Sequence, residues 1–355
     1  MERENVIGKL KLEKEKMKMK KIFATVIVLI CIVCTVTGCT SGENTSSNND
    51  LPEKVVIGTQ SFVHDQTLAM AAGYFEETFG EDISVETVVF SSGRDAINAM
   101  ISGDVDFIYS GSIPAVSGLA NGLEAEVIWV HNVLNRSDAV VARSGSGITS
   151  IEDLKGKKVA VPFVSTTHYI LETGLKEAGM TSEDVEMLDL QPDEIYAAWG
   201  RGDIDAAALW DPVLSELEGE EIIYSAGDAA EDGFPTMDLG LVRKDFAQKY
   251  PELVSKYTEA LSKAEQLYDE DKDEAVNILA DALEMSVEDT ENQINGSIWL
   301  NAEEQLSEEY FGGGLGSVLY NVAEYLYENG NLTELPDKDV FDDMVNASYI
   351  EGIVN

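Results

Sequence analysis

The sequence predicts an α/β protein of two lobes with similar architecture, preceded by a leader. Short apolar runs alternate with longer segments of helical spacing, which is typical of strands and helices around a parallel sheet. A Gly-Asp-aliphatic-Asp motif occurs at 103–106 and again at 202–205. Chance similarity is the alternative for so short a motif, but the similar surroundings of both copies favour a repeated helix–turn–strand unit.

Residues 1–38 are predicted to be a lipoprotein signal peptide. A lysine-rich segment precedes the uncharged apolar run 22–37, which is shorter than the roughly 20 apolar residues that span a bilayer. Gly38 before Cys39 resembles a bacterial lipobox, which implies cleavage before Cys39 and lipidation of its sulfur. The polar residues that follow predict a flexible tether over 39–50. We therefore expect a lipid-anchored protein on the extracytoplasmic face of the cell membrane, the alternative being an uncleaved anchor.

Composition limits the chemistry and the partners of the exported chain. Its cysteines are Cys31 and Cys34 in the leader and Cys39, so neither disulfides nor thiolate catalysis are expected. The net charge is −42, and removing the 8 basic and 4 acidic residues before Cys39 brings it near −46. So strong a negative charge excludes nucleic acid as a partner, and we interpret it as a solvated surface that maintains solubility.

The folded part is expected to begin near Leu51, with strands and helices in alternation. The apolar run Val55–Ile57, which ends at Gly58, predicts a buried strand. Residues 68–75 predict a helix, and the alternating residues 84–90 predict a second strand. In each copy of the repeated motif, a helix should end at the glycine and an apolar strand should follow.

The middle of the chain predicts a second lobe and its connections to the first. The run Val159–Val161 predicts a strand that leads into a helix ending near Ala178. The apolar runs at 140–141 and 240–242 are expected to be hinge strands. The first lobe is therefore assigned to 51–143 and 237–355, the second to 144–236, and helices are expected after 245 with a break at 312–314.

No motif in the sequence argues for an enzyme, a metal or a cofactor. The histidines, at 64, 131 and 168, are widely separated, and none has the HExxH spacing of a zinc site. There is no GxSxG nucleophile elbow and no Walker A phosphate loop. We therefore predict a binding protein without catalytic residues.

Two hydroxyl-rich segments are candidates for binding an anion. Ser165, Thr166 and Thr167 lie at a predicted strand-to-helix junction, where unpaired N–H groups and the helix dipole favour a tetrahedral oxyanion. Ser110, Gly111 and Ser112 follow the strand after the first copy of the motif and could contribute from the opposite lobe. An ordinary helix N-cap is the alternative for each segment.

Three segments within 156–246 resemble the taurine-binding proteins of bacterial ABC importers, and weaker similarity extends over nearly all of the chain after Val55. They read GKKVAVPFVSTTHY, LQPDEIYAAWGRGDIDAAALWDP and PTMDLGLVRKDF. The wider family binds alkanesulfonates, nitrate and similar solutes. The resemblance implies a type II periplasmic binding protein fold, with two lobes, two hinge crossings and a ligand cleft. It also implies an ABC permease and its ATPase as partners.

The resemblance further implies which residues line the cleft. Asp238, in the PT-x-D segment, corresponds to the acidic residue that faces the ligand amine, and Trp210 to an aromatic residue at the cleft edge. Such a site suits taurine, because hydroxyl and N–H groups bind a sulfonate while a desolvated carboxylate binds the ammonium. The predicted ligand-binding residues are Gln60, Gly111, Ser112, Ser165, Thr166, Thr167, His168, Trp210 and Asp238.

Several alternatives stay open at this point. His168 could support the binding residues rather than touch the ligand, and Asp238 could be a helix or turn cap. Trp199 is expected in the core, and a core position is the alternative for Trp210 as well. Asp211 departs from the family pattern, which has an apolar residue there, and its carboxylate either favours a more cationic ligand or points to solvent. The ligand could also be an alkanesulfonate, a nitrate-like anion or another small zwitterion, and the protein could serve a membrane sensor. An enzyme on this fold that makes a thiamine pyrimidine precursor would need a histidine- and cysteine-rich site, which the chain after Cys39 lacks.

Overall fold

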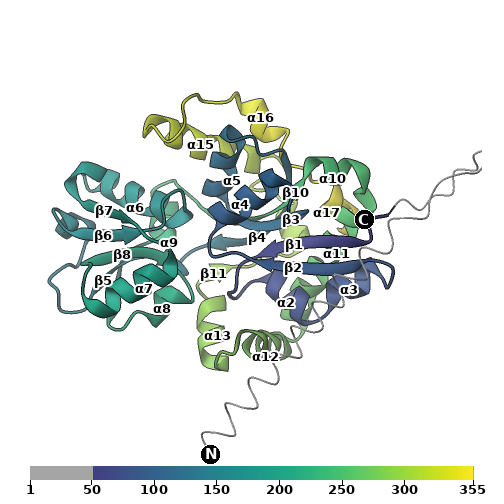
Figure 1. The fold of residues 1–355 in the computed structure, drawn as a ribbon, viewed down its shortest axis with the longest axis horizontal. Helices are drawn as coiled ribbons and strands as arrows, with labels where there is room; N and C mark the ends of the chain where they lie inside the picture. Colours follow the sequence, from purple (N-terminus) through teal and green to yellow (C-terminus); the bar gives the residue numbers. More distant parts are fainter. Residues whose placement is uncertain (1–50, 355) are drawn as a thin grey trace, which may run out of the picture. The chain divides into compact units, whose positions relative to one another are not determined.

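The computed structural model describes residues 51–354, so the predicted signal peptide, the tether and Cys39 lie outside the described residues. The described strands form two sheets, and the chain crosses twice between them (Figure 1). We call the parts built on these sheets the first and the second lobe. No helix in the described range is both long and apolar enough to cross a membrane.

The first sheet has the strand order β11-β4-β10-β3-β1-β2. Strands β2, β1 and β3 run parallel, whereas β10 runs antiparallel to β3 and β4. The sheet is therefore mixed rather than parallel as expected, because β10 enters it from the second lobe. Its strands are β1 (Lys54–Thr59), β2 (Ser84–Val89), β3 (Phe107–Gly111), β4 (Ala125–Leu134), β10 (Met237–Arg243) and β11 (Ser297–Ile298).

The second sheet repeats this arrangement in the order β7-β6-β8-β5-β9. Strands β7, β6 and β8 run parallel, and β5, which enters from the first lobe, runs antiparallel to β8 and β9. The two lobes thus share one plan, as the repeated motif predicts. The strands are β5 (Asp138–Arg143), β6 (Lys158–Val161), β7 (Glu186–Asp189), β8 (Ala206–Trp210) and β9 (Glu220–Ser225).

The first crossing between the sheets comes earlier in the chain than expected. It lies between Leu134 and Asp138, because β5 pairs with β8 and β9 of the second sheet. The predicted boundary at 143/144 is therefore wrong by one strand, and Val140 and Val141 are core residues of the second lobe instead of a hinge. An apolar run predicts a buried strand, but it carries no information about which sheet that strand joins.

The repeated motif has the same structural role in both lobes. Helices α4 (Gly93–Ser102) and α7 (Pro192–Arg201) end at Gly103 and Gly202, whose φ angles of 78° and 73° suit glycine. The second aspartate of each motif then accepts a hydrogen bond of 2.9 Å from the neighbouring parallel strand, Asp106 from β1 and Asp205 from β6. The prediction of a helix that ends at glycine and leads into an apolar strand is confirmed.

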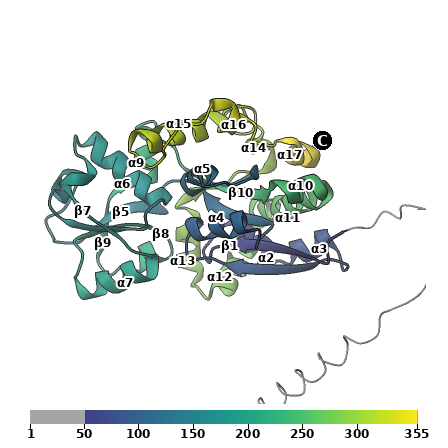
Figure 2. The same cartoon turned by 45° about the horizontal axis from the view of Figure 1, so that its top comes forward.

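Helices of the first lobe pack around its sheet (Figures 1 and 2). The segment 68–75, expected as one helix, belongs to two, because Gly73 adopts a left-handed φ of 76° between them. Near the end of the chain the predicted glycine break precedes α15. The helices are α2 (Asp65–Ala71), α3 (Tyr74–Phe79), α4, α5 (Ser112–Ala120), α10 (Lys244–Lys249), α11 (Pro251–Glu270), α12 (Lys272–Leu283), α13 (Val287–Ile294), α14 (Ala302–Gln305), α15 (Leu315–Glu328), α16 (Lys338–Asp342) and α17 (Ser348–Val354).

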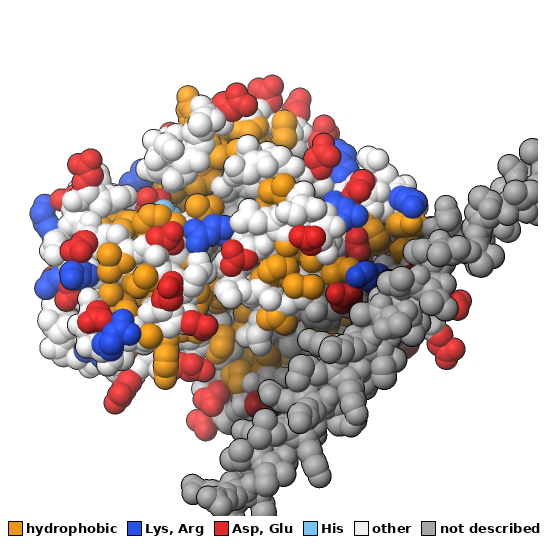
Figure 3. Space-filling model, viewed as in Figure 1, with side chains coloured by type: hydrophobic (Ala, Val, Ile, Leu, Met, Phe, Trp, Pro, Cys, Tyr) orange, Lys and Arg blue, Asp and Glu red, His pale blue; other side chains and the backbone are white. Residues whose placement is uncertain are grey.

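Helices of the second lobe cover both faces of its sheet, so the core there has two layers. One layer contains Val140 and Val159, and the other contains Val141 and Trp199, which confirms that this tryptophan is a core residue. The helices are η1 (Ile151–Leu154), α6 (Thr166–Glu177), η2 (Ser182–Asp184), α7, α8 (Val213–Glu216) and α9 (Ala226–Glu231). On the face shown in Figure 3, acidic side chains are spread over the surface with lysines and arginines between them, which fits a solvated acidic surface.

Side-chain contacts from α15 and α4 of the first lobe reach the second lobe. The Tyr325 hydroxyl of α15 donates a hydrogen bond of 3.0 Å to Glu172 of α6. On α4, Arg94 donates to the carbonyl oxygen of Phe163 at 3.1 Å and lies 3.4 Å from the Asp189 carboxylate. These contacts hold the two walls of the cavity described below.

Candidate functional site

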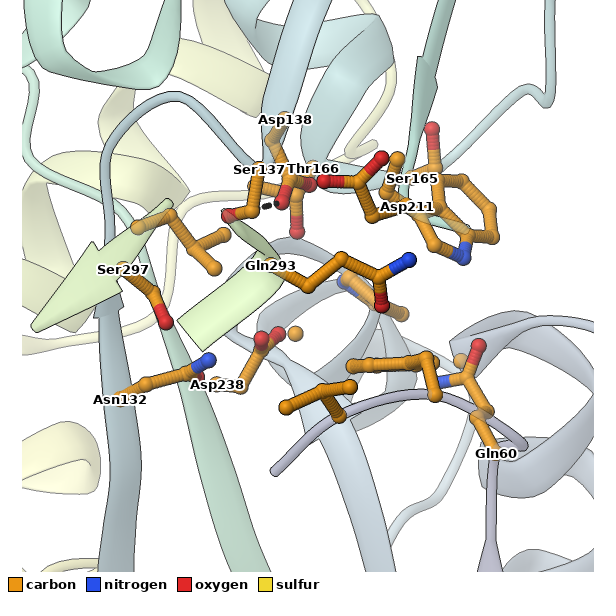
Figure 4. Close-up of a pocket in the computed structure, with 17 residues that line it drawn as sticks. Gln60, Asn132, Ser137, Asp138, Ser165, Thr166, Asp211, Asp238, Gln293 and Ser297 are labelled. Carbon is orange, nitrogen blue, oxygen red and sulfur yellow. Dashed lines mark hydrogen bonds between the residues drawn. The ribbon is translucent and has the colours of Figure 1, made fainter. Parts of the chain in front are cut away.

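A cavity lies between the lobes, where strands of both sheets end (Figure 4). The space between its lining residues that no atom fills amounts to about 560 Å³, a figure that includes space open to solvent. Asp138, Asp211 and Ser165 lie along the second-lobe wall, while Asp238 and Gln60 lie along the first-lobe wall. The lining residues are Gln60, Phe62, Val63, Gly93, Gly111, Pro114, Asn132, Leu134, Ser137, Asp138, Ser165, Thr166, Trp210, Asp211, Asp238, Gln293 and Ser297.

Six of the nine predicted ligand-binding residues line this cavity: Gln60, Gly111, Ser165, Thr166, Trp210 and Asp238. Ser112, Thr167 and His168 do not. Ser112 is buried at the start of α5. The hydroxyl of Thr167 donates to the carbonyl oxygen of Ala208 at 3.3 Å, which attaches the start of α6 to β8.

His168 stabilises the turn before α6 rather than lining the cavity. Its Nδ1 accepts from the N–H of Val164 at 3.4 Å, and its ring stacks on Phe163 with 4.7 Å between centroids. Val164 has a φ of 60°, a strained conformation for a β-branched residue. Burial lowers the pKa of His168, although the carboxylates of Glu172 and Asp189 oppose this. A neutral imidazole that supports a strained turn fits the supporting role left open for this residue.

The N-terminus of α6 forms the part of the second-lobe wall that can bind an anion. Ser165 is the N-cap, and its hydroxyl accepts a hydrogen bond of 3.1 Å from the N–H of His168. The Ser165 side chain therefore acts as a helix N-cap, which was the alternative to anion binding for this residue. The other N–H groups at the start of the helix have no partner within it, and Thr166 adds a hydroxyl beside them. Together they form a donor-rich surface at the positive end of a helix dipole.

Gly111 allows the two walls to approach each other. A Cβ atom at this position would overlap the hydroxyl oxygen of Thr166 and would lie 3.4 Å from Oδ1 of Asp238. Gly111 pairs directly with Asp238 where β3 meets β10. Residues from three segments, two in the first lobe and one in the second, therefore meet at a point where only glycine fits.

Asp238 is a buried carboxylate on the first-lobe wall. It is 7% exposed and accepts a short hydrogen bond from the Tyr109 hydroxyl. Burial raises the pKa of Asp238 to about 6, although the hydrogen bond from Tyr109 and the nearby His131 act in the opposite direction. The side chain is therefore an acid in a cavity whose lining contains no lysine, arginine or histidine.

A buried polar cluster lies behind Asp238. The Asp65 carboxylate accepts from Nδ1 of His131 at 2.5 Å and from the indole N–H of Trp129 at 2.7 Å. Burial acts to raise the pKa of Asp65, but the charge and hydrogen bond of His131 outweigh it and hold this pKa at about 2. The Tyr109 ring lies 4.8 Å from the His131 ring, so the cluster supports the phenol that in turn orients Asp238.

Two further carboxylates, Asp138 and Asp211, line the cavity from the second lobe. Asp211, noted as a departure from the family pattern, accepts from the N–H of Ser215 at 3.0 Å and from its hydroxyl. Burial raises its pKa. Asp138 is absent from the predicted site. Residues directly after a crossing between the lobes lie near the cleft, so the position of Asp138 could have indicated it. The predicted boundary at 143/144 placed the crossing after Asp138 and so left this residue out.

Among residues 51–354 no group of histidine, cysteine, aspartate and glutamate side chains has an arrangement that could hold a metal ion. The three cavity carboxylates are spread over both walls of the cavity (Figure 4).

Comparison with known proteins gives one family and a set of similar folds. Residues 65–275 match the NMT1/THI5 like family. The chain is 33% identical over 285 residues to the taurine-binding periplasmic protein of Escherichia coli (strain K12), covering 78% of this chain and 87% of that relative.

Two solved structures have the same fold. One is the periplasmic aliphatic sulphonate binding protein SsuA from Escherichia coli, with a TM-score of 0.67 and 22% identity, covering 81% of this chain and 97% of that one. The other is the alkanesulfonate-binding protein SsuA from Xanthomonas axonopodis pv. citri bound to MOPS, with a TM-score of 0.68 and 21% identity, covering 83% and 98%. These likenesses confirm the expected periplasmic binding protein fold.

Proposed function

The chain belongs to the NMT1/THI5 like family, and from this premise we propose that it is an extracytoplasmic solute-binding protein for taurine or a close aminosulfonate. In this proposal the solute is passed to an ABC permease and its ATPase. Cys39, which lies outside the described residues, would carry the lipid that anchors the protein to the membrane. The proposal includes no catalysis.

The observation that carries the proposal is the placement of Asp238 opposite the N-terminus of α6. A buried carboxylate in a cavity whose described lining residues include no lysine, arginine or histidine favours a ligand that brings its own cation. The first turn of α6 and the hydroxyl of Thr166 offer donors to an acceptor such as a sulfonate, which stays ionised and cannot donate. An aminosulfonate has an ammonium and a sulfonate on one short chain. Taurine, one such compound, is the ligand in the name of a relative that is 33% identical to this chain.

The same geometry disfavours the anionic alternatives. An alkanesulfonate or a nitrate-like ion would enter a cavity lined by Asp138, Asp211 and Asp238 without any compensating cation. Each acid that remained ionised would then lose water and gain no partner, which is unfavourable. Another small zwitterion with an ammonium group would satisfy the acids equally well. Titrating the protein with zwitterions that differ in their anionic group distinguishes these ligands.

The test is calorimetric titration of the full-length chain in mild detergent, first with taurine and then with ethanesulfonate, which lacks the ammonium. We expect taurine to bind more tightly. The change Asp238→Asn should weaken taurine by about 2–5 kcal/mol, which is roughly 30-fold or more in Kd, and should leave ethanesulfonate unchanged or improved. Asp203→Asn, an equal change of charge at an exposed side chain on the second-lobe surface, is the matched control.

Two results would contradict the proposal in different ways. Equal affinity of the unmodified protein for taurine and ethanesulfonate would show that Asp238 does not bind the amine. Absence of binding to both compounds would reject the aminosulfonate class while leaving the fold untouched.

A further inference from the structure

Binding of a ligand amine by Asp238 alone does not explain why the second-lobe wall of the cavity also carries carboxylates. Asp138 is the first residue of β5 and lies directly after the chain enters the second lobe. The residue is 6% exposed and lines the cavity. A single acid facing the amine would leave Asp138 buried without a function.

The protein provides little compensation for this buried acid. Its Oδ2 accepts one hydrogen bond, of 3.1 Å, from the adjacent Ser137 hydroxyl. Among the described residues Asp138 has no salt-bridge partner, and Oδ1 has no hydrogen-bond partner. Asp211 differs in this respect, because Ser215 donates to it from both its backbone and its hydroxyl.

Asp138 and Asp238 face the same space from different lobes. Figure 4 shows them on opposite walls, with Asp138 beside Ser137 and Asp238 beside Asn132. Both line the same cavity, and after burial itself the charge of Asp238 is the main factor that raises the pKa of Asp138. If both carboxyl groups were ionised they would repel each other across the cavity and favour separation of the lobes, unless a cation lay between them.

We propose that Asp138 is a specificity-determining residue, and that the cationic group of the ligand lies between Asp138 of the second lobe and Asp238 of the first. This inference rests on the proposed function. The cation then joins the lobes, so that its recognition and the closure of the cavity are one event. The ligand class narrows to compounds with a primary ammonium or a guanidinium, whose several N–H donors can reach two walls at once.

The arrangement also predicts which cations are rejected. A trimethylated amine has the same charge as a primary ammonium but no N–H group, so it would leave both carboxylates without a hydrogen bond. Its methyl groups also need space between the walls. Taurine should therefore bind more tightly than N,N,N-trimethyltaurine, and both should differ from ethanesulfonate, which has no cation.

The experiment measures Kd for these three compounds by calorimetry with the full-length chain in detergent. We expect Asp138→Asn to weaken taurine at least tenfold without weakening ethanesulfonate. The double variant with Asp238→Asn should lose less than the sum of the two single losses in free energy, because both acids act on one nitrogen. Asp138→Glu, which keeps the charge, should retain the preference for taurine over ethanesulfonate.

Thermal unfolding of the ligand-free protein separates binding from structure. If Asp138 acts on the ligand, Asp138→Asn should keep or raise the melting temperature without ligand, and taurine should stabilise this variant less than the unmodified chain. A lower melting temperature together with unchanged taurine affinity would overturn the inference and assign Asp138 a structural role. Tighter taurine binding by Asp138→Asn would overturn it as well.

These results are distinguishable from failure of the proposed function. If the unmodified chain does not bind taurine, the aminosulfonate proposal fails. If the unmodified chain binds taurine and prefers it to ethanesulfonate, but Asp138→Asn does so equally, the proposed function stands and the assignment of Asp138 fails.

Discussion

Lowering the pH from 7 to 5 should weaken the binding of taurine and should not weaken the binding of ethanesulfonate. The reason is the ionisation of the cavity acids, since the ammonium and the sulfonate of the ligand both keep their charges in this range. Burial raises the pKa of Asp238 to about 6, so that this group loses its charge within the range. A protonated Asp238 cannot form an ion pair with the ammonium.

The magnitude follows from this pKa. A group with a pKa of about 6 is about nine-tenths ionised at pH 7 and about one-tenth ionised at pH 5. The apparent Kd should therefore rise about tenfold, which corresponds to about 1.4 kcal/mol. Asp138, whose pKa is raised well above its ordinary value by burial and by Asp238, makes the dependence steeper, because it must also ionise when it pairs with the cation.

The fold should persist over this pH range. A carboxyl group with a raised pKa binds its proton more tightly in the folded chain, so Asp238 stabilises the ligand-free protein at low pH and this contribution is lost as the pH rises through about 6. Asp65 has the opposite sign. Its pKa of about 2 stabilises the fold above pH 4, and this contribution is lost only as the pH falls toward 2.

Calorimetric titrations at pH 5, 6 and 7, each in two buffers with different ionisation enthalpies, provide the measurement. Taurine binding near pH 6 should release protons, which appears as a difference in heat between the buffers. In Asp238→Asn the dependence on pH should be reduced. The reasoning is refuted if taurine affinity is constant from pH 5 to 7, or if ethanesulfonate loses affinity on acidification to the same extent.

Two further predictions concern residues that support the site. Asp65→Asn removes one partner of a buried ion pair with His131, so urea unfolding at pH 7 should show a loss of about 3–5 kcal/mol; a loss below 1 kcal/mol would mean that the pair does not stabilise the fold. Gly111→Ala places a Cβ against Thr166 across the cavity, and overpacking of about 1–3 kcal/mol should raise the Kd for taurine roughly 5- to 100-fold. Gly200→Ala, which meets no atom within 4 Å, is its control, and equal affinities of these two glycine variants would contradict the crowding argument.

Much of the fold could be predicted because local patterns determine local structure. Glycine at the end of α4 and of α7 is required by backbone conformation, and the aspartate after it joins adjacent strands, so a repeated motif predicted a repeated lobe. The direction of β5 and β10 could not be predicted in this way. A buried strand has the same apolar pattern whether its neighbours are parallel or antiparallel, and whichever lobe it joins.

The sequence by itself determined the α/β class, the two lobes, the donor-rich start of α6 and, through resemblance, the acid at Asp238. Only the tertiary structure decided that Asp138 faces Asp238 across one cavity. It also decided that Thr167 and His168 support the start of α6 instead of lining the cavity. The physical reason is that burial and charge repulsion depend on distances between segments about 100 residues apart. Chemical identity is present in the sequence, whereas the environment that shifts a pKa or leaves an acid without a partner exists only after the lobes come together.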